Sequence, residues 1–262
     1  MPLPATAEYA EYAPAAALRA YVACYWTRRA RSAGGARGHR VLPDGCIDIL
    51  LELGGPAGGE PAALGVVGTM TRALVVSPEQ HPAAFLGVRF RPGGAHPFLA
   101  VPAAELTDRR VELGDVWGGA MTRALADRAA AAPGLVAKVR AVEGVLLERL
   151  ARVAAVPRDV SAAVEIIVRA GGAASVEALS GALGVTRQHL ARRFARYVGV
   201  TPKMLCRVVR AQGVVERAAR AERVEWSALA YELGYADQSH LVSDFRELAG
   251  VTPEAWRRGL GE

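Results

Sequence analysis

The chain has 262 residues and a mass of 27.6 kDa, with hydrophobic side chains at 52% and charged side chains at 22%. This composition excludes a disordered chain, and the length is sufficient for two modest domains with separate cores. A net charge of +6 permits an acidic partner such as nucleic acid but does not require one.

The sequence has no run of about 18 uncharged apolar residues, which a membrane-spanning helix would need. Its N-terminus lacks the basic and then apolar pattern of a secretory signal. Cys24, Cys46 and Cys206 are odd in number and widely spaced, unlike an extracellular disulfide framework. We therefore expect a cytoplasmic protein that has reduced thiols and does not bind a membrane.

The first hundred residues alternate short apolar runs with turn-forming sequences such as PDG and RPGG. Residues with β-branched side chains are frequent in the runs, which predicts strands. The expected strands cover 47–53, 63–68, 73–76 and 85–90. We predict a compact, mainly antiparallel β domain over residues 1–117, able to sense an effector or to dimerise.

From residue 118 the spacing of apolar residues changes to three and four, which predicts helices at 119–131 and 135–153. We interpret 118–157 as connecting helices, because Pro157 interrupts the pattern there. The second helix carries an apolar stripe that either packs within the chain or pairs two chains in a homodimer. The stripe consists of Leu135, Val139, Val142, Leu146 and Leu150.

Residues 158–262 contain one pattern twice. Leu190, Phe194 and a GVTP sequence recur 51 residues later as Leu241, Phe245 and a second GVTP. A short helix, a turn with glycine and a second helix with Leu and Phe four apart describe a helix-turn-helix unit. Two such units, joined by a helix over 202–221, predict either a tandem DNA reader or two packed helical hairpins.

The charge distribution favours the DNA reader. Between residues 175 and 212 seven basic side chains accompany one acidic side chain, whereas 213–262 carry six basic and nine acidic ones. We expect the recognition helices at about 186–198 and 237–249, in adjacent major-groove segments of double-stranded DNA. The first unit should supply most of the affinity.

The buried side of each recognition helix determines which residues face the DNA, because Leu and Phe occupy the core side. The predicted base contacts are Gln188, Ala191 and Arg192 in the first unit and Ser239, Val242 and Ser243 in the second. The predicted phosphate contacts flank these faces. They are Arg187, Arg193, Arg196, Lys203, Gln238, His240 and Arg246.

The segment from about 160 to 258 resembles the AraC/XylS family of bacterial transcription regulators. The resemblance rests on SVEALSGALGVTRQHLARRFARYVGVTPKML and on LGYADQSHLVSDFRELAGVTPEAW. It implies two recognition helices in the major groove, an N-terminal domain that senses a small molecule or dimerises, and RNA polymerase as a partner. A strong base-contacting residue of many relatives falls at Ser243, so the resemblance implies weak base readout by the second unit.

The N-terminal half resembles an uncharacterised module of some AraC-like regulators. The similar stretches are HRVLPDGCIDILLEL, GVVGTMT and FLGVRFRPGGAHPFLAVPAAEL. This resemblance implies a cupin-like β barrel and no particular ligand. The expected fold class is α+β, with a β-rich, cupin-like domain followed by helices and an all-α domain with two helix-turn-helix motifs.

The histidines of the N-terminal half do not form the pattern of a cupin metal site, because His39, His81 and His96 are isolated and no HxH pair occurs. We predict no enzymatic activity, no catalytic residue, no bound metal and no cofactor. The alternative is a regulator with a metal-sensing, redox-sensing or catalytic N-terminal domain, in which Cys24, Cys46 and His39 meet in space.

Two further features of this half are candidates for effector binding. Arg89 and Arg91 alternate with apolar residues, so one strand face is basic and either binds an acidic effector inside a barrel or faces solvent. Asp44 and Asp48 either share a strand face as an acid/base pair or belong to a turn, which the PDG sequence favours. The candidate effector-binding residues are Arg89, Arg91 and Asp44.

Overall fold

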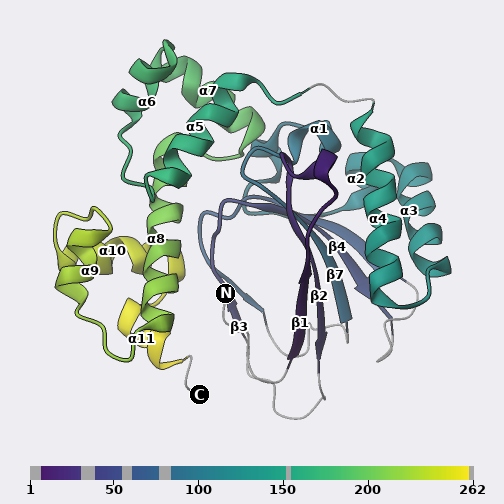
Figure 1. Ribbon diagram of the computed structural model, residues 1–262, viewed down its shortest axis with the longest axis horizontal. Coiled ribbons are helices and arrows are strands. Elements are labelled where there is room, and N and C mark those ends of the chain that lie inside the picture. The colour runs from purple at the N-terminus through teal and green to yellow at the C-terminus, as the bar shows by residue number, and fades with distance from the viewer. Residues whose placement is uncertain (1–6, 31–38, 55–60, 77–83, 152–154, 260–262) are drawn as a thin grey trace.

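The computed structural model of the protein describes residues 7–30, 39–54, 61–76, 84–151 and 155–259. Figure 1 shows a β-rich half and a helical half side by side, with helix α8 running along the boundary between them. Within the described residues, no helix is long and apolar enough to span a membrane. The predicted fold class, a β-rich domain followed by an all-helical region with two helix-turn-helix units, is confirmed.

The N-terminal half is built on a six-stranded antiparallel sheet. Its strands, in spatial order, are β1 (Ala7–Tyr12), β2 (Val22–Ala30), β7 (Ala84–Phe90), β4 (Ile47–Leu53), β5 (Pro61–Val67) and β8 (Arg110–Glu112). A separate two-stranded sheet pairs β3 (His39–Val41) with β6 (Leu74–Val76). The short 3-10 helices η1 (Ala16–Leu18) and η3 (Ala103–Leu106) and the helix α1 (His96–Leu99) lie in the connections.

The two faces of the large sheet differ in polarity, because side chains alternate along each strand. In β4, Ile49 and Leu51 are fully buried on one face, while Asp48 points to the other. Asp48 lies opposite Arg89 of β7, and Arg89 in turn lies opposite Cys24 of β2. The register therefore brings an acid, a base and a thiol from three strands together on one face.

The other face of the sheet packs against α2 (Leu113–Trp117), α3 (Gly119–Ala131) and α4 (Gly134–Leu150). Val142 and Leu146 of α4 are at most 1% exposed and share one hydrophobic core with Ile49. The helices interpreted as a connection thus complete the core of the N-terminal half. Of the two roles considered for the apolar stripe of α4, the structure shows the intramolecular one.

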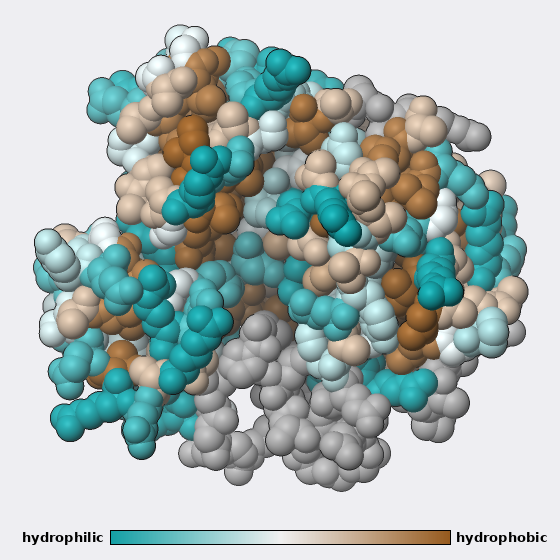
Figure 2. All heavy atoms as spheres, in the orientation of Figure 1, coloured by the Kyte–Doolittle hydropathy of each residue, from teal (hydrophilic) through white to brown (hydrophobic). Residues whose placement is uncertain are grey.

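The C-terminal half is entirely helical in its described residues and has two hydrophobic cores, one for each helix-turn-helix unit. Its helices are α5 (Arg158–Arg169), α6 (Val176–Leu183), α7 (Arg187–Tyr197), α8 (Pro202–Arg220), α9 (Trp226–Glu232), α10 (Gln238–Ala249) and α11 (Pro253–Arg258). Hydrophilic residues cover the lower left of the face in Figure 2, where α9, α10 and α11 lie in Figure 1.

Candidate nucleic-acid interface

Each of the two helices predicted to be recognition helices begins at a side-chain cap in the turn before it. Thr186 Oγ1 accepts a hydrogen bond from the backbone N–H of His189 at 3.1 Å, which fixes the start of α7. Asp237 Oδ1 accepts one from the N–H of His240 at 2.7 Å at the start of α10. Such caps satisfy backbone donors that a helix leaves unpaired at its N-terminus. The two helices predicted to be recognition helices, α7 and α10, therefore start within one residue of the predicted positions.

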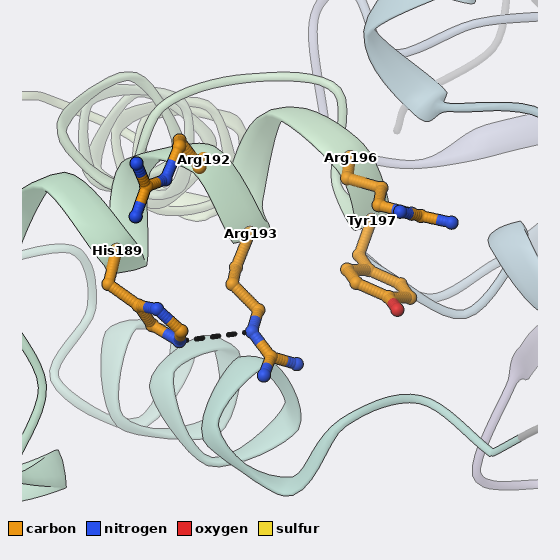
Figure 3. Close-up of a pocket in the computed structure, with 5 residues that line it drawn as sticks. All are labelled: His189, Arg192, Arg193, Arg196 and Tyr197. Atoms are coloured by element: carbon orange, nitrogen blue, oxygen red, sulfur yellow. Dashed lines mark hydrogen bonds between the residues drawn. The ribbon is translucent and has the colours of Figure 1, made fainter.

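The core side of each recognition helix is anchored as expected, since Leu190, Phe194, Leu241 and Phe245 are all 0% exposed. The outward side of α7 is strongly basic. Arg187, Gln188, Arg192 and Arg196 are exposed there, Ala191 is half-buried, and Lys203 is exposed at the start of α8. A shallow depression of about 460 Å³ lies on this helix, lined by His189, Arg192, Arg193, Arg196 and Tyr197 (Figure 3).

Arg193 differs from its neighbours, because it is held by the first unit itself. Its Nε lies 3.4 Å from Asp159 Oδ2 on α5 and donates to His189 Nε2 at 3.1 Å. His189 Nε2 is also 3.4 Å from the same carboxylate oxygen. Figure 3 shows Arg193 and His189 turned toward one another, with Arg192 apart from them. Arg193, predicted as a phosphate contact, thus ties α7 to α5.

The outward side of α10 differs from that of α7 in its chemistry. A depression of about 430 Å³ is lined by Gln238, Ser239, Val242, Ser243 and Arg246. Ser243 occupies the repeat position of Arg192, and Gln238 that of Arg187, so two cations of the first unit are neutral here. The predicted base-contacting residues Ser239, Val242 and Ser243 therefore lie together on α10. The only arginine that lines this depression is Arg246.

His240, predicted as a phosphate contact, is engaged within its own unit. Its Nδ1 accepts a hydrogen bond from the N–H of Ala236 at 3.3 Å, and its ring packs edge-on against Tyr235, with ring centroids 5.3 Å apart. These contacts shape the turn between α9 and α10. The exposed residues Gln238 and Arg246 remain the second unit's candidates for phosphate binding.

Two arginines in the basic stretch of the sequence face the second unit instead of the surface of the first. Arg207 Nε donates to Asp244 Oδ1 at 2.5 Å, and its Nη2 lies 2.7 Å from Glu247 Oε2. Arg210 Nη2 lies 3.9 Å from Asp244 Oδ2, and its guanidinium lies 4.9 Å from the ring centroid of Tyr235. These contacts hold α10 against α8. The local charge excess of the sequence is therefore only partly available to DNA.

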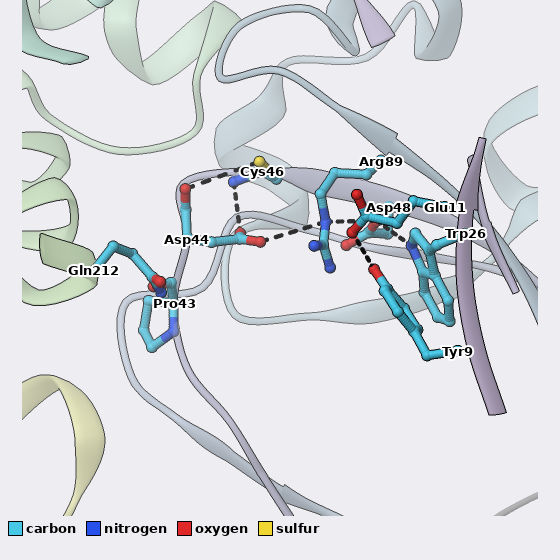
Figure 4. Close-up of polar contacts among 9 residues, drawn as sticks. All are labelled: Tyr9, Glu11, Trp26, Pro43, Asp44, Cys46, Asp48, Arg89 and Gln212. Carbon is cyan, nitrogen blue, oxygen red and sulfur yellow. Dashed lines mark hydrogen bonds and ion pairs between the residues drawn. The ribbon is translucent and has the colours of Figure 1, made fainter. Parts of the chain in front are cut away.

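On the polar face of the N-terminal sheet, Arg89 stands between two carboxylates (Figure 4). Its Nε lies 3.4 Å from Asp44 Oδ2 and 3.4 Å from Asp48 Oδ1, and Trp26 Nε1 donates to Asp48 Oδ1 at 3.1 Å. Burial raises the pKa of Asp48 to about 6, although the charge of Arg89 opposes the shift. Asp44 belongs to a turn, as predicted, since its Oδ1 accepts from the N–H of Cys46 at 2.9 Å.

The structure brings together two of the three candidate effector-binding residues and separates the third. Asp44 meets Arg89, whereas Arg91 is exposed and its Nε donates to the carbonyl of Arg19 at 2.9 Å. The sequence did not assign Asp48 to this cluster. Because two carboxylates already face Arg89, its charge is compensated, which removes the physical reason for an acidic effector at this point.

The two thiols near this cluster, Cys24 and Cys46, are half-buried. Burial raises the pKa of Cys24 to about 11 and that of Cys46 well above its ordinary value, which disfavours the reactive thiolate. Among the residues that the structure describes, no group of three or more His, Cys, Asp or Glu is placed to hold a metal ion. The proposed sensor cannot be followed to His39, whose side chain lies outside the described part; His81 lies outside it entirely.

Comparisons with known proteins assign a domain to each half. Residues 10–112 match a family model described as a domain of unknown function (DUF6597), and residues 179–259 match one described as a helix-turn-helix domain. No curated protein matches the sequence. The second match begins within α6 and extends through α11.

Solved structures with similarity to the chain include the C-terminal domain of AraT, a response regulator from Geobacillus stearothermophilus. It is 21% identical, with a TM-score of 0.38 over 40% of this chain and 88% of that one. ToxT from Vibrio cholerae is 9% identical, with a TM-score of 0.42 over 97% and 98% of the two chains. Wild-type ToxT with a bound unsaturated fatty acid is 11% identical, with a TM-score of 0.44 over 84% and 91%. By these matches, the chain carries a helix-turn-helix domain over residues 179–259, preceded by a domain of unknown function over residues 10–112.

Proposed function

We propose that the protein is a sequence-specific transcriptional regulator in which α7 and α10 read adjacent major-groove segments of double-stranded DNA. One observation carries the proposal. Two capped helices stand in equivalent positions of a repeat, each with its Leu and Phe fully buried and its opposite face open. A helix of this kind fits the major groove, where base edges present distinct donors and acceptors.

The two units have unequal tasks in this proposal. Gln188 and Arg192 of α7 contact base edges, while Arg187, Arg196 and Lys203 bind phosphates and supply most of the affinity. The second unit contributes Ser239, Val242 and Ser243 toward bases and Gln238 and Arg246 toward phosphates. Because its net positive charge is lower, the second unit contributes more to the alignment of the protein on the DNA than to the binding affinity.

The N-terminal half modulates DNA binding in this proposal, through the cluster of Asp44, Asp48 and Arg89. Pro43, next to Asp44, accepts a hydrogen bond from Gln212 Nε2 of α8 (Figure 4). A small molecule that rearranges the carboxylates around Arg89 would therefore move a turn that touches the helix between the two readers. Three further points stay predictions from the sequence. They are an interaction with RNA polymerase, the formation of a homodimer and a cytoplasmic location.

The test is selection of binding sites from a random DNA pool with the full-length protein, followed by affinity measurements on the selected site. Arg192→Ala should weaken binding by about 1–3 kcal/mol and relax the preference at one base position. Arg128→Ala is the matched control, because Arg128 lies on α3, the helix that covers the sheet. A pool that yields no common site, or equal effects of the two substitutions, would contradict the proposal.

A further inference from the structure

The N-terminal half holds both recognition helices at their C-terminal ends, through one short segment between β5 and β6. Thr69 Oγ1 donates to the carbonyl of Val198, the residue that follows α7, at 2.6 Å. The N–H of Ala73 donates to the carbonyl of Leu248, in the last turn of α10, at 2.7 Å. The segment 69–73 therefore touches the first unit at one end and the second unit at the other.

A second pair of donors reaches the same two helix ends. Thr107 Oγ1 donates to the carbonyl of Gly199 at 2.6 Å, and Arg40 Nη1 donates to the carbonyl of Ala249 at 2.9 Å. Val198 and Ala249 occupy equivalent positions in the two repeats. The last carbonyls of a helix have no partner within the helix, so these donors satisfy acceptors that would otherwise need water.

The glycines of the two GVTP sequences make this approach feasible. Gly199 has φ +91° and Gly250 has φ +73°, values that favour glycine at a helix end. A β-carbon at Gly199 would lie 3.0 Å from Thr107 Oγ1, and one at Gly250 would lie 2.8 Å from Arg40 Nη1. The repeated glycine is thus the point at which the N-terminal half approaches each reader.

The segment 69–73 is itself braced from within the N-terminal half. Asp108 Oδ1 accepts from the N–H of Thr71 at 2.7 Å, and the N–H of Asp108 donates to the carbonyl of Thr69 at 3.1 Å. The preceding Gly68 donates its N–H to the carbonyl of Arg109 at 3.0 Å. Contacts within the N-terminal half therefore hold the shape of the segment.

The two readers have separate hydrophobic cores and are joined by α8. Helix α8 has 19 residues and is about 28 Å long, and helices of this length are rarely straight. The ion pairs of Arg207 and Arg210 with Asp244 tie α10 to α8, and a second attachment at a distance from α8 restrains the angle between the units further. The contacts of Thr69, Thr107, Arg40 and Ala73 form this second attachment.

We propose that Thr69, Thr107 and Arg40 are positioning residues that fix the distance and angle between α7 and α10, and so determine which spacing of DNA half-sites the protein accepts. This inference rests on the proposed function as a DNA reader. Gln188, Arg192, Ser239 and Ser243 are exposed while these contacts are made, so the clamped arrangement leaves both reading faces open.

Spacing is a sensitive reporter of this role. Each inserted base pair moves one half-site by about 3.4 Å along the axis and rotates it by about 34°, since a turn holds about 10.5 pairs. If α7 and α10 are held at a fixed distance and angle, the inserted base pair costs the protein its contacts at one half-site. A pair joined only by α8 adapts and discriminates less.

The experiment uses the full-length protein and the DNA site selected from the random pool, with versions that carry one or two base pairs inserted between the halves. The ratio of dissociation constants, inserted over original, measures discrimination. In Thr69→Val/Thr107→Val this ratio should fall by about fivefold to thirtyfold relative to wild type. Thr69→Ser keeps the hydroxyl and should retain the wild-type ratio, which a general loss of packing would not explain.

Thermal unfolding of each variant checks that the domains are folded. If the double variant does not fold, Arg40→Ala tests the same role at the second unit and should also lower the ratio. An unchanged ratio in folded variants would overturn the inference and leave the DNA-reading function in place. Tighter binding of the variants to the original site would also overturn it, because the contacts would then restrain binding. Failure of the wild type to select any site would instead count against the proposed function.

Discussion

At the scale of single residues, the two repeats use one position in opposite ways. Arg193 of α7 faces Asp159, whereas its repeat equivalent, Asp244 of α10, faces Arg207. In both units an ion pair ties the recognition helix to a neighbouring helix, with the charges exchanged. The sequence could not show these pairs, because each partner is more than thirty residues away and only tertiary packing brings the two charges together.

A further residue-scale effect concerns Asp48, whose carboxyl group is buried beside Arg89. Burial raises its pKa from 3.8 to about 6. The folded state then binds the proton more tightly than the unfolded state, so the stability contributed by Asp48 falls as pH rises from about 4 to about 6 and is level above that. Relative to Asp48→Asn, wild type should lose about 1–3 kcal/mol of unfolding free energy across this window.

Urea unfolding of both proteins at a series of pH values measures this difference. Asn is the suitable reference, because it keeps the shape of the side chain and does not titrate. A difference between wild type and variant that stays constant with pH, or that grows in favour of wild type as pH rises, would show that Asp48 does not hold the raised pKa.

At the scale of elements, the sequence predicted those parts whose ends carry a local signal. Strand β4 was found in full, because a turn precedes it and apolar residues alternate along it. The starts of α7 and α8 lie within one residue of the predicted positions, and Thr186 and Thr201 cap the helices that follow them. The outward faces of α7 and α10 followed from the buried Leu and Phe.

Some elements were not predicted from the sequence. Either they lack a local signal at their ends, or the signal is present and was overlooked. Strands β1 and β2 carry Glu and Arg among their apolar residues, because one face of the sheet is polar and β1 is an edge strand. Helix α11 was overlooked, although Thr252 and Pro253 repeat the start of α8. The donors from Thr69, Thr107 and Arg40 had no signal, since hydroxyls and guanidinium groups in loops have many other uses.

The packing of α10 on α8 gives an element-scale prediction. Asp244 is 7% exposed and accepts from Arg207, so Asp244→Ala leaves a largely buried guanidinium with one carboxylate instead of two. We expect a loss of about 1–3 kcal/mol of unfolding free energy. Glu247→Ala removes the exposed partner of the same arginine and should change stability by less than about 0.5 kcal/mol. Chemical denaturation of the two variants measures both losses of unfolding free energy. Equal losses would argue against a buried ion pair that holds α10 to α8.

At the scale of the whole molecule, the chain joins a sheet with one covered and one polar face to a pair of readers held at three places. Helix α8 joins the readers directly, the turn at Pro43 contacts α8 through Gln212, and segment 69–73 reaches the ends of both recognition helices. Figure 1 shows α8 between the sheet and helices α9 and α10. A change on the polar face therefore has a short physical route to α7 and α10, the helices that we propose read DNA.

The most direct test of two-helix reading is methylation interference on the selected DNA site, which reports the major-groove edge of guanine. The account predicts two groups of sensitive positions about 10 base pairs apart, with the stronger group assigned to α7 by its loss in Arg192→Ala. A single group of positions, or sensitivity that Arg192→Ala leaves unchanged, would contradict the claim that α7 and α10 read DNA together.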